Sequence, residues 1–391
     1  MSLLRKKRIY LDYAAATPLL PEVKRAMDKY WSQDFHNPSS VYQEGTKVRQ
    51  KVEDYRRQLA TILGVSKKDI FFTSGGTESN NLALLGVFKE ALMPSDNTLP
   101  ILRPHIVISD LEHSSVRETA MEIVRLGGEV SILRGNENGF ISLEAVEKLL
   151  RPNTILVSIT LASNITGTLE PISKIGRIVQ EKRRKNGDKY PYLHTDASQA
   201  SNYIDINLQK LKADLLTVDS SKVYGPRGVG LLALTPNVSL RPIIFGGGQE
   251  RGLRSGTENT ALIAGFVTAL EIAKRDREVE LKRLEELKNF FLDELKRSLP
   301  QVTVISATKN TLPSIVSVLL PTGALNELVL LDLDRNGIAV STGSACDSLG
   351  EIENESLLRF SFGRGTTKGD LRQVLKVFAR ILKHDKPPHL L

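Results

Sequence analysis

The chain contains very little cysteine: one residue among 391, at position 346. A single cysteine excludes an intramolecular disulfide, so a cytoplasmic location is expected. Long hydrophobic runs are absent too. The apolar run at residues 155–162 is too short, and too interrupted by Ser158 and Thr160, to span a bilayer. The basic start at residues 5–8 has no apolar segment behind it, so neither a secretory signal nor a membrane partner is predicted.

The content of hydrophobic and charged residues, 41% and 25%, is ordinary for a globular protein. The net charge is +8, and basic residues cluster at 5–8, 181–185 and 274–283. An acidic partner or a nucleic acid is one interpretation of this charge. The second and third clusters lie in helical patterns that also contain glutamate. A solvated helix face is therefore the better interpretation, and direct nucleic-acid binding is not expected.

Helical and strand-like segments alternate over the first two-thirds of the chain. Strands are predicted at residues 70–73, 106–109, 155–160, 192–195, 215–218 and 230–234. Helices are predicted at residues 21–31, 45–63, 78–91, 115–126 and 172–184. Apolar strands that alternate with helices predict an α/β fold with a mostly parallel sheet covered on both faces. A long helical pattern at residues 259–299 leads into a second domain.

Three junctions between a strand and a loop contain candidate ligand-binding residues, because open parallel sheets bind ligands beyond the carboxyl ends of their strands. The first, Ser-Gly-Gly-Thr-Glu at 74–78, opens a helix and can bind an anion, although a plain turn has the same pattern. In the second, Asp196 ends a strand and needs a cationic partner, unless it is a helix N-cap. In the third, Lys222 is placed for a Schiff base, although a lone lysine is usually a surface residue. Together the three junctions describe a pyridoxal-phosphate (PLP) enzyme.

The single cysteine lies in a loop of small residues, Ser-Thr-Gly-Ser-Ala-Cys-Asp-Ser at 341–348, after a short strand predicted at 338–340. A thiol in such a loop is reachable, whereas a packing cysteine usually lies inside an apolar run. An incidental thiol is the alternative. Lys222, Asp196 and His113 elsewhere in the chain favour a functional thiol.

Several long motifs resemble those of one family, the cysteine desulfurases of the NifS/IscS type, which belong to the class-V aminotransferases. The resemblance covers nearly the whole chain, from residue 10 to residue 364. The motifs are Tyr-Leu-Asp-Tyr-Ala-Ala at 10–15, Asn-Pro-Ser-Ser at 37–40, Thr-Ser-Gly-Gly-Thr-Glu-Ser-Asn-Asn at 73–81, Glu-His at 112–113, Asp-Ala-Ser-Gln at 196–199, Gly-Gly-Gly-Gln-Glu at 246–250, Arg-Ser-Gly-Thr at 254–257, Gly-Ser-Ala-Cys at 343–346 and Arg-Phe-Ser-Phe-Gly-Arg at 359–364.

This resemblance implies the PLP fold type I, which is like that of aspartate aminotransferase. A large domain at 15–262, with a seven-stranded, mostly parallel sheet, would bind the cofactor. A smaller α+β domain, made of 1–14 and 263–391, would carry the cysteine loop.

The resemblance also implies roles for single residues. Lys222 would carry PLP as a Schiff base, Asp196 would pair with the pyridine nitrogen, and Gln199 would bind the phenolic oxygen. His113 would stack on the ring and take part in proton transfer, and Cys346 would be the nucleophile. No metal is expected. The other residues expected at the site are Gly76, Thr77 and Ser220 at the phosphate, Thr257 at the phosphate of the neighbouring subunit, and Asn37, Asn164 and Arg359 at the substrate.

The implied reaction converts L-cysteine to L-alanine and holds the sulfur as a persulfide on Cys346. The sulfur would then pass to an acceptor, such as an iron–sulfur scaffold or a thiolation protein. Thr257 implies a homodimer with shared sites. Two alternatives are a selenocysteine or cysteine-conjugate lyase, in which Cys346 is dispensable, and a catalytically impaired paralogue that acts as a binding partner in sulfur trafficking.

The segment before Lys222 departs from the family's usual Ser-x-His-Lys pattern. Asp219 and Ser221 stand in place of the serine and the histidine. A carboxylate near a phosphate is repulsive unless a cation intervenes or the side chain turns away. Ser220 is the candidate to take over the phosphate contact.

Two further departures concern the substrate side. Ile165 stands where the family commonly has glutamate, which removes a polar group near the cofactor. Only residues 347–358 separate Cys346 from Arg359, a shorter segment than family members with this motif usually have. A short loop reaches an adjacent cofactor more easily than a distant acceptor.

Overall fold

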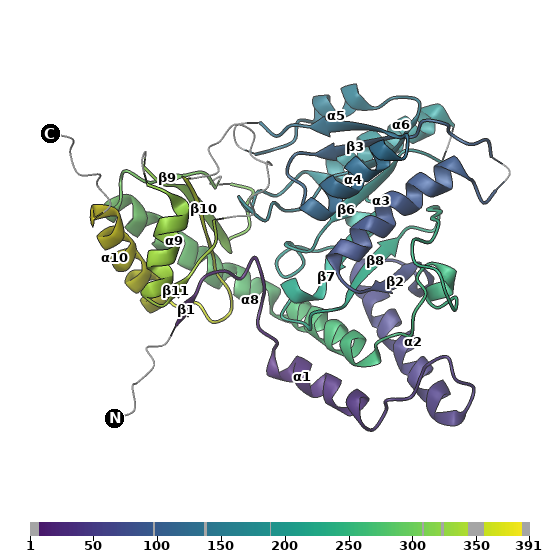
Figure 1. Ribbon diagram of the computed structural model, residues 1–391, viewed down its shortest axis with the longest axis horizontal. Coiled ribbons are helices and arrows are strands. Elements are labelled where there is room, and N and C mark those ends of the chain that lie inside the picture. Colours follow the sequence, from purple (N-terminus) through teal and green to yellow (C-terminus); the bar gives the residue numbers. More distant parts are fainter. Residues whose placement is uncertain are drawn as a thin grey trace. The chain divides into compact units, whose positions relative to one another are not determined.

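The computed structural model describes residues 8–96, 98–136, 139–187, 189–306, 309–321, 324–342 and 356–384. The chain divides into two compact units (Figure 1). The larger unit consists of residues 17–162 and 170–276, and the smaller of residues 1–16, 163–169 and 277–391. One boundary falls within the long helix α8 (Thr260–Ser298). The domain limits expected from the resemblance, 14/15 and 262/263, stay a prediction.

The larger unit is built on a seven-stranded sheet in the order β2-β8-β7-β6-β5-β3-β4. Strand β8 runs antiparallel to both of its neighbours, and the other pairs are parallel, which confirms the predicted α/β fold. The strands are β2 (Ile70–Thr73), β3 (His105–Ser109), β4 (Glu129–Leu133), β5 (Thr154–Ser158), β6 (Tyr192–Asp196), β7 (Leu215–Asp219) and β8 (Gly230–Leu234).

Helices bury the faces of this sheet, and its strands β3 and β5 are buried along their whole length. In Figure 1, α3 and α4 lie over the sheet, and their apolar side chains belong to one core cluster with those of β3, β5 and β8. The helices are α1 (Pro21–Asp28), α2 (Gln43–Leu63), α3 (Gly76–Leu92), α4 (Ser114–Arg125), α5 (Leu143–Leu149), α6 (Ile172–Asn186), α7 (Leu208–Leu211) and the first part of α8.

Local sequence explains where several helices begin and end. Helix α1 has Pro21 at its first position, where the missing N–H costs no hydrogen bond. Helix α2 ends at Gly64, which adopts φ +70°, and a Cβ there would lie 2.1 Å from the side chain of Asn207. Only glycine fits this left-handed position.

The smaller unit has an α+β architecture. Its antiparallel sheet has the order β12-β10-β9, and a second, two-stranded parallel sheet pairs β1 with β11. Phe291 of α8 packs against Phe360 and Phe362, with ring centroids 5.1 and 5.4 Å away. The elements are β1 (Ile9–Tyr10), β9 (Thr303–Val304), β10 (Ile315–Leu319), α9 (Asn326–Arg335), β11 (Ile338–Ala339), β12 (Leu357–Ser361), α10 (Lys368–His384) and the last part of α8.

Neither unit contains, in the ranges given above, a helix with the length and apolar character that a bilayer span requires.

Candidate active site

Two carboxylates end neighbouring strands of the large sheet. Asp196 is the last residue of β6, and Asp219 is the last residue of β7. The two strands are parallel neighbours, so both carboxylates lie at the carboxyl edge of the sheet. Strand β2 leads through Ser74 and Gly75 into helix α3, which supplies donors to both. Sequence reasoning placed the ligand site at this kind of edge.

The carboxylate of Asp196 is held by two donors. Its Oδ1 accepts the backbone N–H of Ser198 at 2.9 Å, and its Oδ2 accepts the side-chain amide of Asn80 at 2.8 Å. Asn80 lies on α3 and is 1% exposed. These bonds fix a negative charge at the strand end, as a cationic partner such as a pyridinium nitrogen requires.

Asn80 also connects Asp196 to the expected ring-stacking histidine. Its amide nitrogen donates to Ser115 Oγ at 2.9 Å, and Ser115 Oγ lies 2.9 Å from His113 Nδ1. The backbone N–H of Ser115 donates to the same nitrogen at 3.1 Å. Because Nδ1 accepts this N–H, the proton of the neutral His113 ring is on Nε2. Sequence reasoning missed Asn80 and Ser115, although Asn80 stands inside a quoted motif.

Lys222 lies in a single 3-10 turn, Ser220–Lys222, that follows β7 directly. Asp219 caps this turn, because its Oδ1 accepts the N–H of Ser221 at 2.7 Å. The carbonyl of Lys222 accepts the side-chain amide of Asn202 at 2.6 Å. The backbone at the lysine is therefore fixed from both sides of the turn.

A glycine cradle lies at the start of α3. Gly75 adopts φ +151°, and a Cβ on Gly75 or on Gly76 would lie 3.3 Å from Asp219 Oδ2. Gly230 of the adjacent strand packs so closely that a Cβ there would lie 2.8 Å from Gly75 Cα. The N–H of Gly76 donates to Asp219 Oδ2 at 2.9 Å. The Asp219 side chain therefore does not turn away from the expected phosphate position.

The residues at this edge fit PLP. Asp196 offers a fixed negative charge to the ring nitrogen, and Lys222 follows the adjacent strand. The buried hydroxyl of Ser198 has no hydrogen-bond partner within the described ranges and lies 3.5 Å from the position of a Cβ on Gly76. An orphaned buried hydroxyl beside a glycine cradle is suited to an oxygen-rich group such as a phosphate.

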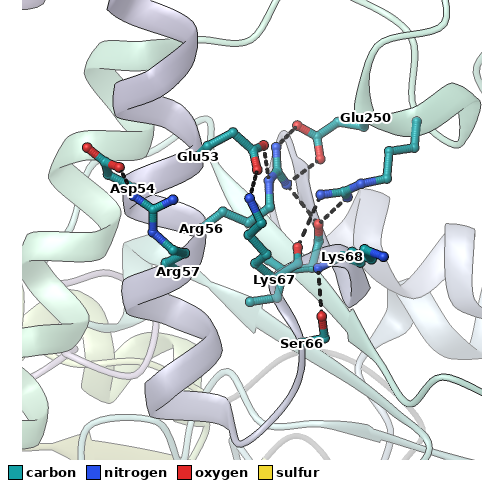
Figure 2. A network of polar contacts seen from close by, with 10 residues as sticks. Glu53, Asp54, Arg56, Arg57, Ser66, Lys67, Lys68 and Glu250 are labelled. Atoms are coloured by element: carbon teal, nitrogen blue, oxygen red, sulfur yellow. Dashed lines mark hydrogen bonds and ion pairs between the residues drawn. The ribbon is translucent and has the colours of Figure 1, made fainter.

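The loop between β8 and α8, which contains Thr257, is fixed by a buried ion pair (Figure 2). Arg56 of α2 donates from Nη1 and Nη2 to the two carboxylate oxygens of Glu250, at 2.8 and 2.9 Å. Glu250 also accepts the N–H of Phe72 at 3.0 Å. Glu250 and Arg251 adopt φ +47° and +56°, conformations that non-glycine residues take only when their surroundings hold them.

The network in Figure 2 continues to the surface through Glu53, which accepts from Arg56 Nε at 3.0 Å and from Lys67 at 3.2 Å. Burial alone would raise the pKa of Glu53, but Arg56 and Lys67 lower it.

Further along the same loop, Arg254 contacts the first turn of α3. Its Nε lies 2.8 Å from Oε1 of Glu78, whose Oε2 accepts the N–H of Ser74 at 2.8 Å. Burial acts to raise the pKa of Glu78, but the hydrogen bonds from Arg254 and Ser74 lower it overall. A pocket of about 250 Å³ next to this pair is lined by Thr73, Arg254 and Thr257 among others. The loop that holds Thr257 is thus tied to the helix that begins at the glycine cradle.

In the smaller unit, Arg359 and Asn164 come together. Arg359 is 4% exposed, and its Nη1 donates to the carbonyl of Asn164 at 2.9 Å. Its Nη2 pairs with Asp12 at 2.9 Å. Arg359 Nε is buried and has no hydrogen-bond partner among the described residues. Sequence reasoning had not singled out Asp12 as a partner of Arg359, although Asp12 stands inside a quoted motif.

Other predicted residues take less specific positions. Gln199 and Thr77 follow Ser198 and Gly76 in the chain; Gln199 is half-buried and Thr77 is exposed. Asn37 lies in an exposed turn, where its Oδ1 accepts the N–H of Ser39 at 2.9 Å. Their roles at the site stay predictions.

Three more residues singled out from the sequence are Ser220, Ile165 and Cys346. The hydroxyl of Ser220 is buried and would lie 2.2 Å from a Cβ on Gly225, so it is directed toward that glycine. Ile165 is a core residue, 4% exposed. Cys346 lies outside the described residues. The described ranges contain no group of three His, Cys, Asp or Glu side chains able to hold a metal.

Comparison with known proteins places this site in a family. Residues 9–374 match the family Aminotransferase class-V, and the chain belongs to that family. The "Cysteine desulfurase IscS" of Dictyoglomus turgidum is 37% identical, over 97% of this chain and 95% of that protein. A solved structure titled "NIFS-LIKE PROTEIN" has a TM-score of 0.89 and 32% identity, over 96% of this chain and all of that one.

A further solved structure, titled "SspA in complex with cysteine", has a TM-score of 0.76 and 30% identity, over 90% of this chain and 98% of that one. The resemblance to cysteine desulfurases of the NifS/IscS type is therefore confirmed, and with it the fold. The family is PLP-dependent.

Proposed function

We propose that this chain is a PLP-dependent cysteine desulfurase that converts L-cysteine to L-alanine and holds the sulfur as a persulfide on Cys346. The observation that carries the proposal is the arrangement of Asp196, Asn80, Ser115 and His113 in one hydrogen-bonded series at the carboxyl edge of the sheet. The solved structure of SspA with cysteine supports cysteine as the substrate. Lys222, on the turn after the neighbouring strand, would hold the cofactor covalently.

When bound, PLP supplies an electron sink that makes the Cα–H bond of an amino acid acidic. Asp196 would hold its carboxylate toward the ring nitrogen, oriented by Asn80 and Ser198. His113 holds a proton on Nε2, because Ser115 occupies Nδ1. Lys222 and His113 are therefore the groups that we assign to proton transfer at the substrate and the ring.

Arg359 would bind the substrate carboxylate. Two of its nitrogens are engaged by Asn164 and Asp12, and the third, Nε, retains a donor. A buried guanidinium with an unused N–H favours an anionic ligand, since an unmade hydrogen bond in the protein interior is costly.

The sulfur step uses the thiol of Cys346. Its thiolate attacks the sulfur of the substrate, the S–S bond forms, and the bond between that sulfur and Cβ breaks. The electron pair passes to the substrate carbon, which takes up a proton and becomes the methyl group of alanine. The balance is one L-cysteine and one thiol giving one L-alanine and one persulfide.

Partners follow from the same proposal. Thr257 would complete the phosphate site of a second copy of the chain, which makes the enzyme a homodimer. A protein acceptor, such as an iron–sulfur scaffold or a thiolation protein, would remove the sulfur. The cytoplasmic location expected from the single cysteine stays a prediction.

The test is the intact mass of the purified protein after exposure to L-cysteine without reductant, beside a Cys346→Ala variant. We expect the wild type alone to gain one or more sulfur atoms while alanine is released. Alanine and elemental sulfur from both proteins, without a mass gain, would instead indicate a lyase in which Cys346 is dispensable. A protein that takes up no cofactor would leave the non-catalytic paralogue as the better hypothesis.

A further inference from the structure

The carboxylate of Asp219 lies on the N-terminus of α3, where the cofactor's phosphate is expected. Its Oδ2 accepts the N–H of Gly76 at 2.9 Å, and its Oδ1 accepts the N–H of Ser221 at 2.7 Å. Both oxygens are thus bound to backbone donors. The side chain is half-buried and directed at the glycine cradle.

Asp219 accepts from a backbone N–H at a helix N-terminus, which is a donor that also binds phosphate groups. Helix α3 is 17 residues long, and the first N–H groups of such a helix attract an anion. Gly75 and Gly76 leave room for one beside them, since a Cβ on either would lie 3.3 Å from Asp219 Oδ2. The carboxylate of Asp219 therefore occupies the space that Gly75 and Gly76 leave open because they have no side chain.

Among the residues that the structure describes, no cation forms an ion pair with Asp219, and the guanidinium of Arg254 is engaged by Glu78. A phosphate on Gly76 would meet a negative carboxylate at close range, or would have to displace it from the N–H. In either case, part of the usual attraction between phosphate and helix is lost.

We propose that Asp219 is a built-in anion that competes with the cofactor's phosphate group for the N-terminus of α3, and so determines how strongly this enzyme retains its cofactor. The inference rests on the proposed function, because it concerns the same PLP site. It implies that the phosphate adds little to binding in this chain. Affinity then comes mainly from the ring end, through Asp196 and Lys222, and the cofactor exchanges readily.

The test compares PLP with pyridoxal, the same ring without phosphate. Cofactor-stripped wild type, Asp219→Ser and Asp219→Asn are titrated with each compound, and binding is followed by the absorbance of the bound ring. We expect Asp219→Ser to bind PLP about 10- to 100-fold more tightly than the wild type, with pyridoxal affinity changed less than about threefold. Asp219→Asn should gain PLP affinity in the same direction, because it loses only the charge.

Asp205→Asn is the matched control, since Asp205 pairs with Lys210 on the surface and the substitution changes the net charge equally. Its PLP affinity should equal that of the wild type. Inorganic phosphate gives a second readout: it should compete with PLP in Asp219→Ser and much less in the wild type.

Two outcomes overturn the inference. If Asp219→Ser and Asp219→Asn bind PLP no more tightly than the wild type, Asp219 is only the cap of the turn before Lys222. If both variants shift PLP and pyridoxal equally, the carboxylate does not act on the phosphate. Failure of the proposed function is distinguishable: a chain that is no PLP enzyme would bind neither compound, and a PLP enzyme of another kind would fail the mass experiment with L-cysteine while the comparison of PLP with pyridoxal stays valid.

Discussion

Asp196 and Asp219 are structural counterparts that are expected to face ligand groups of opposite charge. Each ends a strand of the large sheet, accepts through Oδ1 the N–H of the residue two positions later, and accepts through Oδ2 a donor from α3. One is expected to face a cationic ring nitrogen, and the other stands where a phosphate is expected. Under the proposals made above, the same local motif would favour the cofactor at one end and oppose it at the other.

The difference lies in which donor of α3 each carboxylate takes. Asp196 is bound by the side chain of Asn80, in the second turn of the helix, and leaves the helix N-terminus unused. Asp219 is bound by the N–H of Gly76, at the N-terminus itself. A carboxylate bound by a side-chain amide is held in one orientation and leaves the helix N-terminus open to an anion. A carboxylate bound by the first N–H groups of a helix takes the place of such an anion.

The largest expected effect comes from neutralising the first carboxylate. Asp196→Asn removes the negative charge opposite the ring nitrogen while it keeps the shape of the side chain. We expect turnover of L-cysteine to fall about 10³-fold, which corresponds to about 4 kcal/mol in the barrier. Steady-state alanine release at saturating PLP measures it. A fall of less than tenfold would contradict the role of Asp196.

Six strands and most helices of the larger unit were predicted, because buried strands leave continuous apolar runs and helices leave periodic ones. Strand β4 was missed, because most of its residues are only partly buried. The site at the strand ends followed from Asp196, Lys222 and the glycine pair. The donors that orient them did not: Asn80 and Ser115 act through contacts between α3, α4 and β6 that no spacing in the sequence specifies. The direction of the Asp219 side chain likewise depends on the packing of Gly75 against Gly230.

Glu250 is a third carboxylate, fixed by a charged partner, Arg56, in addition to the neutral N–H of Phe72. Glu250 is only 5% exposed. The substitution Arg56→Met removes its charged partner and leaves the N–H of Phe72 as a neutral donor. We expect a loss of about 3 kcal/mol in the free energy of unfolding, because an unpaired buried charge is costly. Chemical denaturation followed by circular dichroism measures this loss.

Two variants serve as controls for that measurement. Arg297→Met breaks an exposed pair with Glu294 and should cost less than about 1 kcal/mol. The double variant Arg56→Met with Glu250→Gln removes both charges and should recover part of the stability. Equal losses from Arg56→Met and Arg297→Met would contradict the importance of burial.

Glu112 is a buried carboxyl group whose two hydrogen-bond donors both bind the same oxygen. Its Oε1 accepts from Ser109 Oγ at 2.5 Å and from the N–H of Thr160 at 2.7 Å, and its buried Oε2 has no partner within the described chain. Burial raises the pKa of Glu112 to about 8, and the charge of Asp196 adds to the effect. This carboxyl group therefore keeps its proton in the folded state at neutral pH.

The smallest expected effect follows from this proton. Between pH 5 and 7 the unfolded chain ionises Glu112 while the folded chain does not, so the folded state binds more protons and loses stability as the pH rises. Glu112→Gln cannot ionise. We therefore expect its stability relative to the wild type to increase by about 2.5 kcal/mol from pH 5 to pH 7, measured by urea denaturation at each pH. A difference that stays constant across this range would mean that Glu112 ionises alike in the folded and unfolded chain, and that its burial with one oxygen unpartnered does not hold the proton.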